Sequence, residues 1–269
     1  MAGNKRLAAR ERATVVEFKD PDDIKIGVKS LKKMLRLHLR FLENKSNGEK
    51  ANLKKAGLLR AGLAGANLSG ANLEQAILEG ANLGKAKLVG ANLFGAKLAG
   101  ADLRGAKLME ANLNGANLKK ADLGKADLEG ANLEEADLEG ANLAEANLWG
   151  IDLWEAHLGE ANLAGANLGG AACLWKSRLG QANLAGANLA EADLWEADLW
   201  KTNLATVNLA KARLEGADLE DADLKGADLA GANLKDVKNL TSKQLRAAKN
   251  WSKALNISED ILKELESTA

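Results

Sequence analysis

A five-residue unit repeats without interruption from residue 51 to residue 170, and a second run of the same unit extends from residue 172 to residue 236. The two runs contain 37 units. Their central residue is Leu in all 37 units, and the residue two positions earlier is Ala in 33 of them. The residue directly before the Leu is most often Asn or Asp, whereas the last two positions vary. Any fold of this chain therefore has to bury a leucine at every fifth residue.

A period of five fits neither of the regular secondary structures. An α-helix has 3.6 residues per turn and would carry these leucines around all of its faces. The frequent Asn, Asp and Gly also disfavour a long helix and favour tight turns. One short extended segment and one turn per unit can instead form a solenoid with Leu and Ala inside and with coils about 4.8 Å apart. The sequence therefore predicts an all-β solenoid.

Units such as Ala66-Asn67-Leu68-Ser69-Gly70 resemble the A(D/N)LXX pattern of the pentapeptide repeat family, and they make up most of the chain. The resemblance implies a right-handed quadrilateral β-helix with four units in each coil, so that each face recurs at every fourth unit. The 37 units would then make about nine coils. Membership of the family does not by itself imply a biochemical activity.

The ends of a solenoid expose a ring of leucines and an open strand edge, which short α-helices are expected to cap. We predict a flexible N-terminal segment over residues 1–19, an N-terminal helical cap over 20–50, the β-helix over 51–236 and a C-terminal helical cap over 237–269. Within the second cap, Thr241 and Gln244 have the spacing of a capping box, and a further helix is expected to begin near Ser258. A dimer formed through these C-terminal helices is the alternative to a simple cap.

The N-terminal helix is expected to begin near Asp20 and Pro21, or a few residues later because Gly27 would weaken its first turn. Its apolar side would carry Ile24, Val28, Leu31, Leu35 and Leu42. Its opposite side would carry Lys25, Lys29, Lys32, Arg36 and Arg40. We interpret this basic side as the solvated face of a cap, with an anionic membrane surface or nucleic acid as the alternative partners.

Charge is distributed unevenly along a chain whose net charge is zero. Residues 51–120 carry a net charge of +6, whereas residues 121–160 contain eleven acidic residues and one basic residue. Cys173 is the only cysteine, which excludes an internal disulfide framework and fits either a reducing compartment or one whose redox state does not matter to the fold. No apolar run has the length of a membrane span or the features of a signal peptide, so we expect a cytoplasmic protein.

No catalytic constellation is visible in the sequence. The chain has two histidines, His38 and His157, and one thiol, so neither a Cys/His nucleophile nor a histidine-based zinc site is predicted. We therefore expect no enzyme activity, no cofactor, no metal and no small-molecule substrate. Some family members imitate duplex DNA and protect type II topoisomerases, and the acidic residues of 121–140 suggest this as an alternative. Those proteins favour aromatic central residues, whereas every central residue here is Leu. Nucleic acid itself is not an expected partner.

Five of the six tryptophans gather in neighbouring coils once residues are assigned to faces by their spacing of four units. Trp154, Trp175 and Trp195 fall at one outward position in three successive coils, where their rings could stack with an offset. Trp149 and Trp200 lie beside them. The polar rim would consist of Asp152, Glu155, Lys176, Asp193 and Glu196. Clustered exposed aromatic residues are typical of binding surfaces.

These features predict a rod-shaped interaction or scaffold protein that binds another protein through its tryptophans. The alternatives are a topoisomerase-binding DNA mimic, a self-associating structural rod, and a tryptophan ladder that only stiffens the solenoid or is covered by the chain's own termini. The one irregularity of the repeat, an extra residue at Ala171, is predicted to form a bulge at a corner beside Gly169 and Gly170, directly below this ladder.

Overall fold

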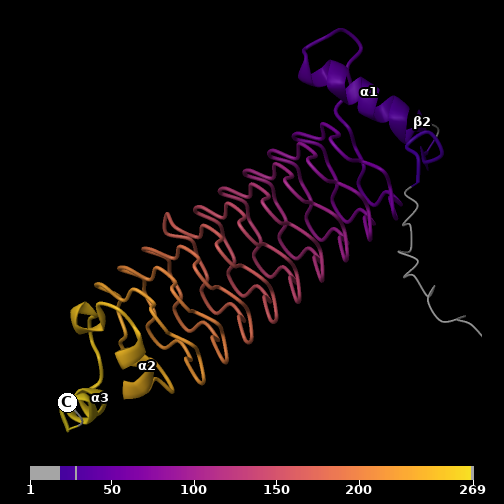
Figure 1. Cartoon of the computed structure of the whole chain (residues 1–269). Helices are drawn as coiled ribbons and strands as arrows, with labels where there is room; N and C mark the ends of the chain where they lie inside the picture. The colour runs from indigo at the N-terminus through magenta and orange to yellow at the C-terminus, as the bar shows by residue number, and fades with distance from the viewer. Residues whose placement is uncertain (1–18, 28, 268–269) are drawn as a thin grey trace, which may run out of the picture.

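The computed structural model describes residues 19–27 and 29–267, and it is a rod of stacked coils with helices at both ends (Figure 1). The residue before each central Leu pairs in parallel with its counterpart one coil later, as Asn52 does with Asn72 and Asn72 with Asn92. Four such columns of pairs run along the rod. We name these four sides faces A, B, C and D after their first central residues, which are Leu53, Leu58, Leu63 and Leu68 respectively.

Each corner between two faces is a tight turn. The amide of Ala56 donates a hydrogen bond of 3.0 Å to the carbonyl of Leu53, and the third residue of this turn, Lys55, has a φ of 57°. A positive φ at the third residue is typical of a type II turn. The turn directs every central Leu inward, and all 37 are at most 3% exposed. The core is therefore a continuous column of leucines lined by the alanines.

The preference for Asn before the leucine has a structural cause, which Asn183 illustrates. Its side-chain carbonyl accepts a hydrogen bond of 3.2 Å from the amide of Ala185, which fixes the turn. Its side-chain amide donates a bond of 3.1 Å to the side-chain carbonyl of Asn162 in the preceding coil. Asn203 continues the series with a bond of 2.9 Å to Asn183. These ladders of asparagine side chains tie neighbouring coils together at the surface of faces C and D.

The N-terminal flank differs from the predicted helix. Residues Lys25–Ile26 (β1) and Lys29–Ser30 (β2) form a short antiparallel pair, and α1 spans Leu31–Leu42. The expected start near Asp20 is wrong, because Gly27, with a φ of 61°, turns the chain between the two strands and Ser30 then caps the helix by accepting from the amide of Lys33. Ile24, Lys25 and Lys29 consequently lie before α1, and the placement of Val28 lies outside the described residues.

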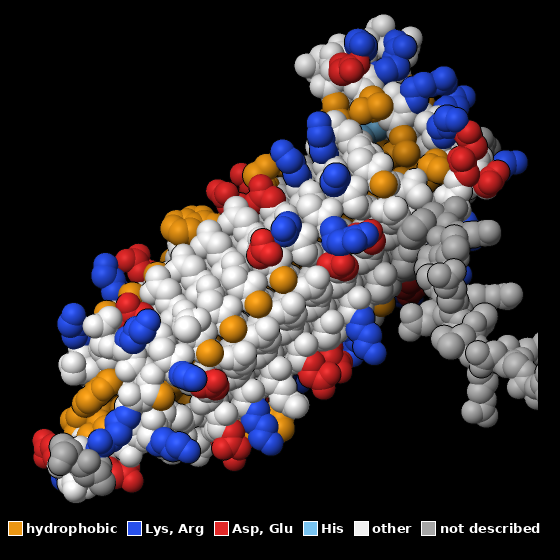
Figure 2. All heavy atoms as spheres, in the orientation of Figure 1, with side chains coloured by type: hydrophobic (Ala, Val, Ile, Leu, Met, Phe, Trp, Pro, Cys, Tyr) orange, Lys and Arg blue, Asp and Glu red, His pale blue; other side chains and the backbone are white. Residues whose placement is uncertain are grey.

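The expected flexible segment also lies outside the described residues, except for Lys19. That residue forms a parallel bridge to Ala61 and accepts a hydrogen bond from the amide of Gly62. On the exposed side of α1 lie Lys32, Lys33, Arg36 and Arg40. Figure 2 shows basic side chains gathered at the α1 end of the rod, and it also shows a wide band of the rod with few charged side chains.

The C-terminal flank contains α2 at Ser242–Ala247, a 3-10 turn at Trp251–Lys253 and α3 at Glu259–Ser267. Thr241 and Gln244 form the predicted capping box. The side-chain amide of Gln244 also donates to the carbonyls of Leu219 and Ala222, at 2.8 and 3.0 Å. Leu245 is fully buried against the last leucines. In the described part of the chain, no helix has the length and apolar character needed to cross a membrane.

The extra residue changes the pairing between two coils. Asn147 pairs with Asn167, its counterpart four units later, whereas Asp152 pairs with Cys173, which lies one residue further along than four units. The separation returns to four units when Cys173 pairs with Asp193. Residues 169–171 form a three-residue turn at the corner between faces D and A. One corner absorbs the insertion, and the leucine register continues unchanged on both sides of it.

Ser177 replaces the usual alanine inside the rod, and we expect its replacement by alanine to change the free energy of unfolding by less than about 1 kcal/mol. The buried Ser177 hydroxyl donates a bond of 2.8 Å to the carbonyl of Leu174, which already accepts the Ser177 amide at 3.1 Å. Removing the hydroxyl therefore leaves no backbone group without a partner. Thermal denaturation of Ser177→Ala against wild type measures the change, and a loss of about 2 kcal/mol or more would contradict this account.

Candidate tryptophan interface

Three tryptophans occupy the outward position of face A in successive coils. The residues two positions before them pair across the coils, Asp152 with Cys173 and Cys173 with Asp193, which places Trp154, Trp175 and Trp195 in one column. Trp149 lies on face D in the coil that precedes the coil of Trp154, and Trp200 lies on face B. The structure thus brings the five tryptophans to neighbouring coils but distributes them over three faces.

The column is only partly a stack of rings. Trp175 is 41% exposed and its ring centre lies 4.7 Å from that of Trp195, with an angle of 57° between the planes. The rings are therefore tilted, and the expected offset stacking of this pair is wrong, because the coil spacing fixes the two backbones but leaves the orientation of each indole to the side chains packed around it. Trp154, Trp195 and Trp200 are half-buried, and among the described residues no ring contact joins Trp154 to Trp175.

Trp149 has a different environment from the others. It is 47% exposed, and its indole lies against the backbone of Gly169 and Gly170 in the next coil. A Cβ atom on Gly170 would lie 2.2 Å from Cε2 of this indole, and one on Gly169 would lie 2.7 Å from its Cζ3. The Trp149 ring therefore packs against the same corner that contains the inserted Ala171.

The predicted rim residues fix the tryptophan backbone and supply charges. The carboxylates of Asp152 and Asp193 accept hydrogen bonds from the amides of Trp154 and Trp195, at 3.0 and 3.1 Å. Arg213 lies 2.8 Å from the carboxylate of Asp193. Both aspartates are thus held by the chain itself.

The remaining rim residues lie on the corner between faces A and B. The Lys176 ammonium lies 5.4 Å from the ring centre of Trp195 and 3.9 Å from the carboxylate of Glu196. A cation above an indole face is attracted to its electron density. Glu155 occupies the same corner in the preceding coil. The rim therefore places both signs of charge next to the exposed indole of Trp175.

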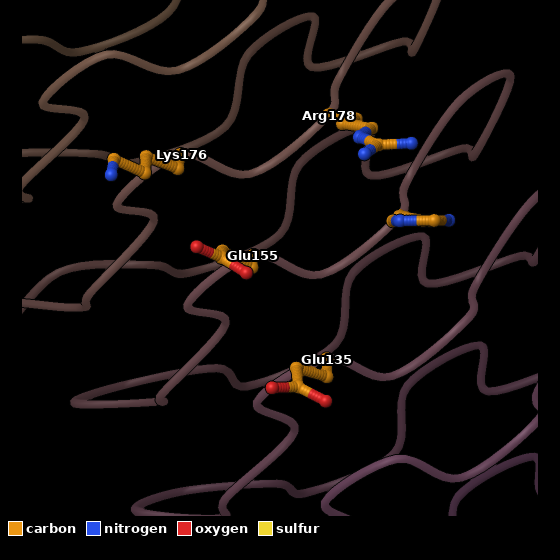
Figure 3. Close-up of a pocket in the computed structure, with 5 residues that line it drawn as sticks. Glu135, Glu155, Lys176 and Arg178 are labelled. Atoms are coloured by element: carbon orange, nitrogen blue, oxygen red, sulfur yellow. The ribbon is translucent and has the colours of Figure 1, made fainter.

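An open hollow borders this column along the same corner (Figure 3). It has a volume of about 450 Å³ and is lined by Glu135, Glu155, His157, Lys176 and Arg178. The two glutamates lie toward the N-terminal end and the two basic residues toward the C-terminal end (Figure 3). In the described chain, Glu135, Glu155 and Arg178 form no ion pair, so their charges are available to a partner.

Cys173 is half-buried on face A, where it is the residue before the central Leu and lies two residues before Trp175. Burial raises the pKa of its thiol, and the neighbouring carboxylates of Asp152 and Asp193 raise it further, so the protonated form persists at neutral pH. Within the described residues, no group of three or more His, Cys, Asp or Glu side chains could hold a metal ion. What these side chains offer is apolar contact area flanked by fixed charges.

Four contributors to this surface were not predicted, namely Glu135, Arg178, His157 and Lys201. Glu135 and Arg178 line the hollow, and the Lys201 ammonium lies 4.5 Å from the ring centre of Trp200. Glu135 and Arg178 could have been found from the spacing of four units. It places Glu135 at the same corner as Glu155, and Arg178 on face B beside His157.

The family model for pentapeptide repeats matches the chain in six overlapping segments, which are 58–95, 86–124, 121–153, 141–172, 172–204 and 202–238. No curated protein matches the sequence. Solved structures of similar sequence exist. HetL, a pentapeptide repeat protein involved in heterocyst differentiation regulation from the cyanobacterium Nostoc sp. strain PCC 7120, is 36% identical; the match covers 83% of this chain and 97% of HetL, with a TM-score of 0.44.

Two further solved structures show the range of the similarity. A pentapeptide repeat protein from the Arabidopsis thaliana thylakoid lumen is 33% identical over 37% of this chain and 65% of its own, with a TM-score of 0.27. QnrB1, a plasmid-mediated fluoroquinolone resistance protein, is 17% identical over 71% of this chain and 92% of its own, with a TM-score of 0.42. The family model covers more than half of the residues, and HetL matches at 36% identity over nearly its whole length. The chain is therefore a member of the pentapeptide repeat family, whose members form right-handed quadrilateral β-helices.

Proposed function

We propose that this chain is a non-enzymatic interaction or scaffold protein that binds another protein through face A. The observation that carries the proposal is the exposed Trp175 in ring contact with Trp195, beside a hollow in which Glu135, Glu155 and Arg178 form no ion pair among the described residues. Rigid aromatic anchors beside fixed charges are the residues that dominate binding energy at protein interfaces. HetL, the similar protein, is involved in regulation of differentiation, and a regulatory role of this kind suits a protein that acts by contact.

The rest of the architecture serves, in this proposal, to hold that surface in a fixed position. About nine coils form a stiff rod in the cytoplasm, and the helical segments 20–50 and 237–269 cap its ends. The buried side chains of Leu31 at one end and Leu245 at the other support the capping role. A dimer through the C-terminal helices is the alternative use of α3, whose Leu262 is 38% exposed.

A topoisomerase-binding DNA mimic is not favoured by the surface. The acidic coils 121–160 are preceded by the basic coils 51–120, so a duplex-like negative surface would extend over only part of the rod. A supercoiling assay of gyrase with and without a fluoroquinolone separates the two proposals. Protection of gyrase by this chain would replace the present proposal with the DNA mimic.

The triple variant Trp154→Ala/Trp175→Ala/Trp195→Ala is expected to lose partner binding at least tenfold, because hot-spot aromatic residues contribute about 2 kcal/mol or more each. Phe94→Ala is the matched control, since Phe94 is 42% exposed at the same position of face A in an earlier coil. Proteins captured from the source cells by wild type would be purified, and their affinities for each variant measured by calorimetry. A partner that binds the folded triple variant as tightly as it binds wild type would refute the proposal.

A further inference from the structure

Face D carries its side chains in an order that is complementary to itself. Along this face, the residue before each central Leu is Asn67, then Lys87, Lys107, Asp127 and Asn147. The residue after each central Leu is Ser69, then Val89, Met109, Glu129 and Trp149. We call one face of one coil a rung. The two basic rungs, those of Lys87 and Lys107, lie on one side of a line midway between Lys107 and Asp127. The one acidic rung, which carries Asp127 and Glu129, lies on the other side.

A two-fold axis along that line would place a second copy antiparallel on face D, with each rung opposite its mirror rung. Lys107 of each copy then faces Asp127 of the other copy, and Glu129 is within diagonal reach of the same ammonium. At the corner between faces C and D, the same operation brings Lys85 of each copy opposite Glu145 of the other. The charges therefore match four times across the contact.

The other rungs are compatible with the same contact. Val89 of each copy lies opposite Trp149 of the other, and the Trp149 indole is the most exposed tryptophan ring that the structure describes, at 47%. The outermost matched rungs are uncharged, since Asn67 and Ser69 lie opposite Asn167 and Gly169. No two rungs of like charge face each other in this arrangement.

The lysines of face D lack partners within the described part of the chain. Lys85, Lys87 and Lys107 are exposed and form no ion pair there, in contrast to Lys54, Lys119, Lys125, Lys176 and Lys211, each of which pairs with an acidic residue one coil away. Lys87 and Lys107 are also direct neighbours in the parallel ladder, where like charges repel. A second copy would supply carboxylates to two of these lysines, Asp127 to Lys107 and Glu145 to Lys85, although Glu145 also pairs with Lys125 of its own copy. Lys87 would lie opposite the uncharged Asn147.

We infer that two copies of this chain associate in antiparallel orientation through face D, with the axis between the rungs of Lys107 and Asp127. The contact is one face wide and spans about five rung spacings, or roughly 24 Å along the rod. This is smaller than a standard interface, so the dimer is concentration-dependent and weakens as salt screens the charge pairs. The association does not rest on the proposed partner site, and it leaves Trp154, Trp175 and Trp195 of both copies accessible on face A.

The test uses the exchange of charges across a two-fold axis. Sedimentation velocity of the full chain at increasing concentration is expected to show a monomer–dimer equilibrium. Lys107→Glu and Asp127→Lys are each expected to raise the dissociation constant at least tenfold, because each creates two like-charged contacts. An equimolar mixture of the two variants is expected to dimerise again, because both contacts across that heterodimer are then opposite in charge. Lys225→Glu near the other end of the rod is the matched control and is expected to behave like wild type.

Each result decides the question, provided that circular dichroism shows the variants to be folded. A wild-type chain that stays monomeric over the concentration range overturns the inference, as does a mixture of variants that fails to dimerise. A dimer that both charge reversals leave intact, and that Leu262→Ser in α3 dissociates, would place the contact at the C-terminal helices instead and would also overturn it. Loss of partner binding in the face A triple variant leaves these measurements unchanged, so the two proposals fail independently.

Discussion

Replacing His38 with alanine is expected to destabilise the N-terminal end of the rod by about 2–5 kcal/mol, because the buried amide of Ala51 and the half-buried carbonyl of Ser69 would each lose a hydrogen bond. His38 lies in α1 and is fully buried. Its Nδ1 accepts a bond of 3.1 Å from the amide of Ala51, and its Nε2 lies 3.1 Å from the carbonyl of Ser69. Since an amide can only donate, Nδ1 is the acceptor and Nε2 carries the proton of a neutral ring. One side chain therefore fastens α1 to the first coil.

The same contact makes the attachment of α1 sensitive to acid. Burial lowers the pKa of His38, and the charge of Lys50 lowers it further, against the partial compensation of the Ser69 carbonyl. The neutral ring is thus favoured in the folded state. Its contribution to stability is complete above the unfolded-state pKa of about 6.5 and is lost as the pH falls below that value toward the lowered folded-state pKa. We therefore expect the attachment of α1 to the rod to weaken as the pH falls below about 6.5.

Hydrogen exchange of the α1 amides at pH 7.5, together with thermal unfolding at pH 7.5 and pH 5, measures this effect. His38→Gln is expected to retain part of the stability, because its amide can still donate to Ser69, and to lose the pH dependence. His157→Ala, at the half-buried histidine of face B, serves as the control and is expected to change neither. Equal stability of wild type and His38→Ala at pH 7.5 would contradict the role assigned to the ring.

Replacing Gly170 with alanine is expected to expel the Trp149 indole from its corner and to destabilise the rod by about 1–3 kcal/mol, as overpacking typically does. The new Cβ would lie 2.2 Å from Cε2 and 2.5 Å from Nε1 of the indole, which is far inside contact distance. Gly170 also has a φ of 71°, where an L-residue costs about 1–2 kcal/mol. The two costs have to be separated.

Gly130→Ala provides the separation. Gly130 occupies the same kind of corner with a φ of 61°, and the nearest atom to a Cβ there is 3.9 Å away in the flexible side chain of Glu110. Its replacement therefore reports the backbone cost alone. Thermal denaturation of both variants, and of each combined with Trp149→Ala, gives a double-mutant cycle. We expect the excess cost of Gly170→Ala to disappear without the indole; an excess that persists would show that the ring does not occupy the corner in solution.

The interior of the rod could be predicted from the sequence because each residue type repeats at one position. Leucine is the third residue of every unit, and only the interior of the rod can accommodate so many leucines at one repeated position. All of these leucines are buried. The spacing of Leu168 and Leu174 likewise locates the extra residue. Outside the five-residue repeat, the prediction of secondary structure was less accurate. The helix start near Asp20 was wrong because the β1–β2 turn depends on the positive φ of Gly27, which amphipathic spacing does not reveal.

The tryptophan surface shows a different limit. Spacing placed Trp175 and Trp195 in adjacent coils, but the tilt of their rings depends on the packing of particular side chains and not on the period. His38 was missed as a structural residue, although it lies seven residues after Leu31 and three after Leu35, on the buried side of α1. A polar ring within an apolar stripe was the available signal. Its two backbone partners could be identified only once α1 was placed against the first coil.

The coil length of four units restricts how a gene for such a rod can change by duplication. Copying four units adds one coil and leaves every later side chain on its original face, so the rod becomes longer while Trp175 and Trp195 keep their direction. Copying a single unit preserves the buried leucines equally well, yet it moves every later residue to the next face and so turns the tryptophans through a quarter of the circumference. The length of the rod and the direction of its tryptophan surface can therefore be altered separately, by two simple genetic events, without loss of the hydrophobic core.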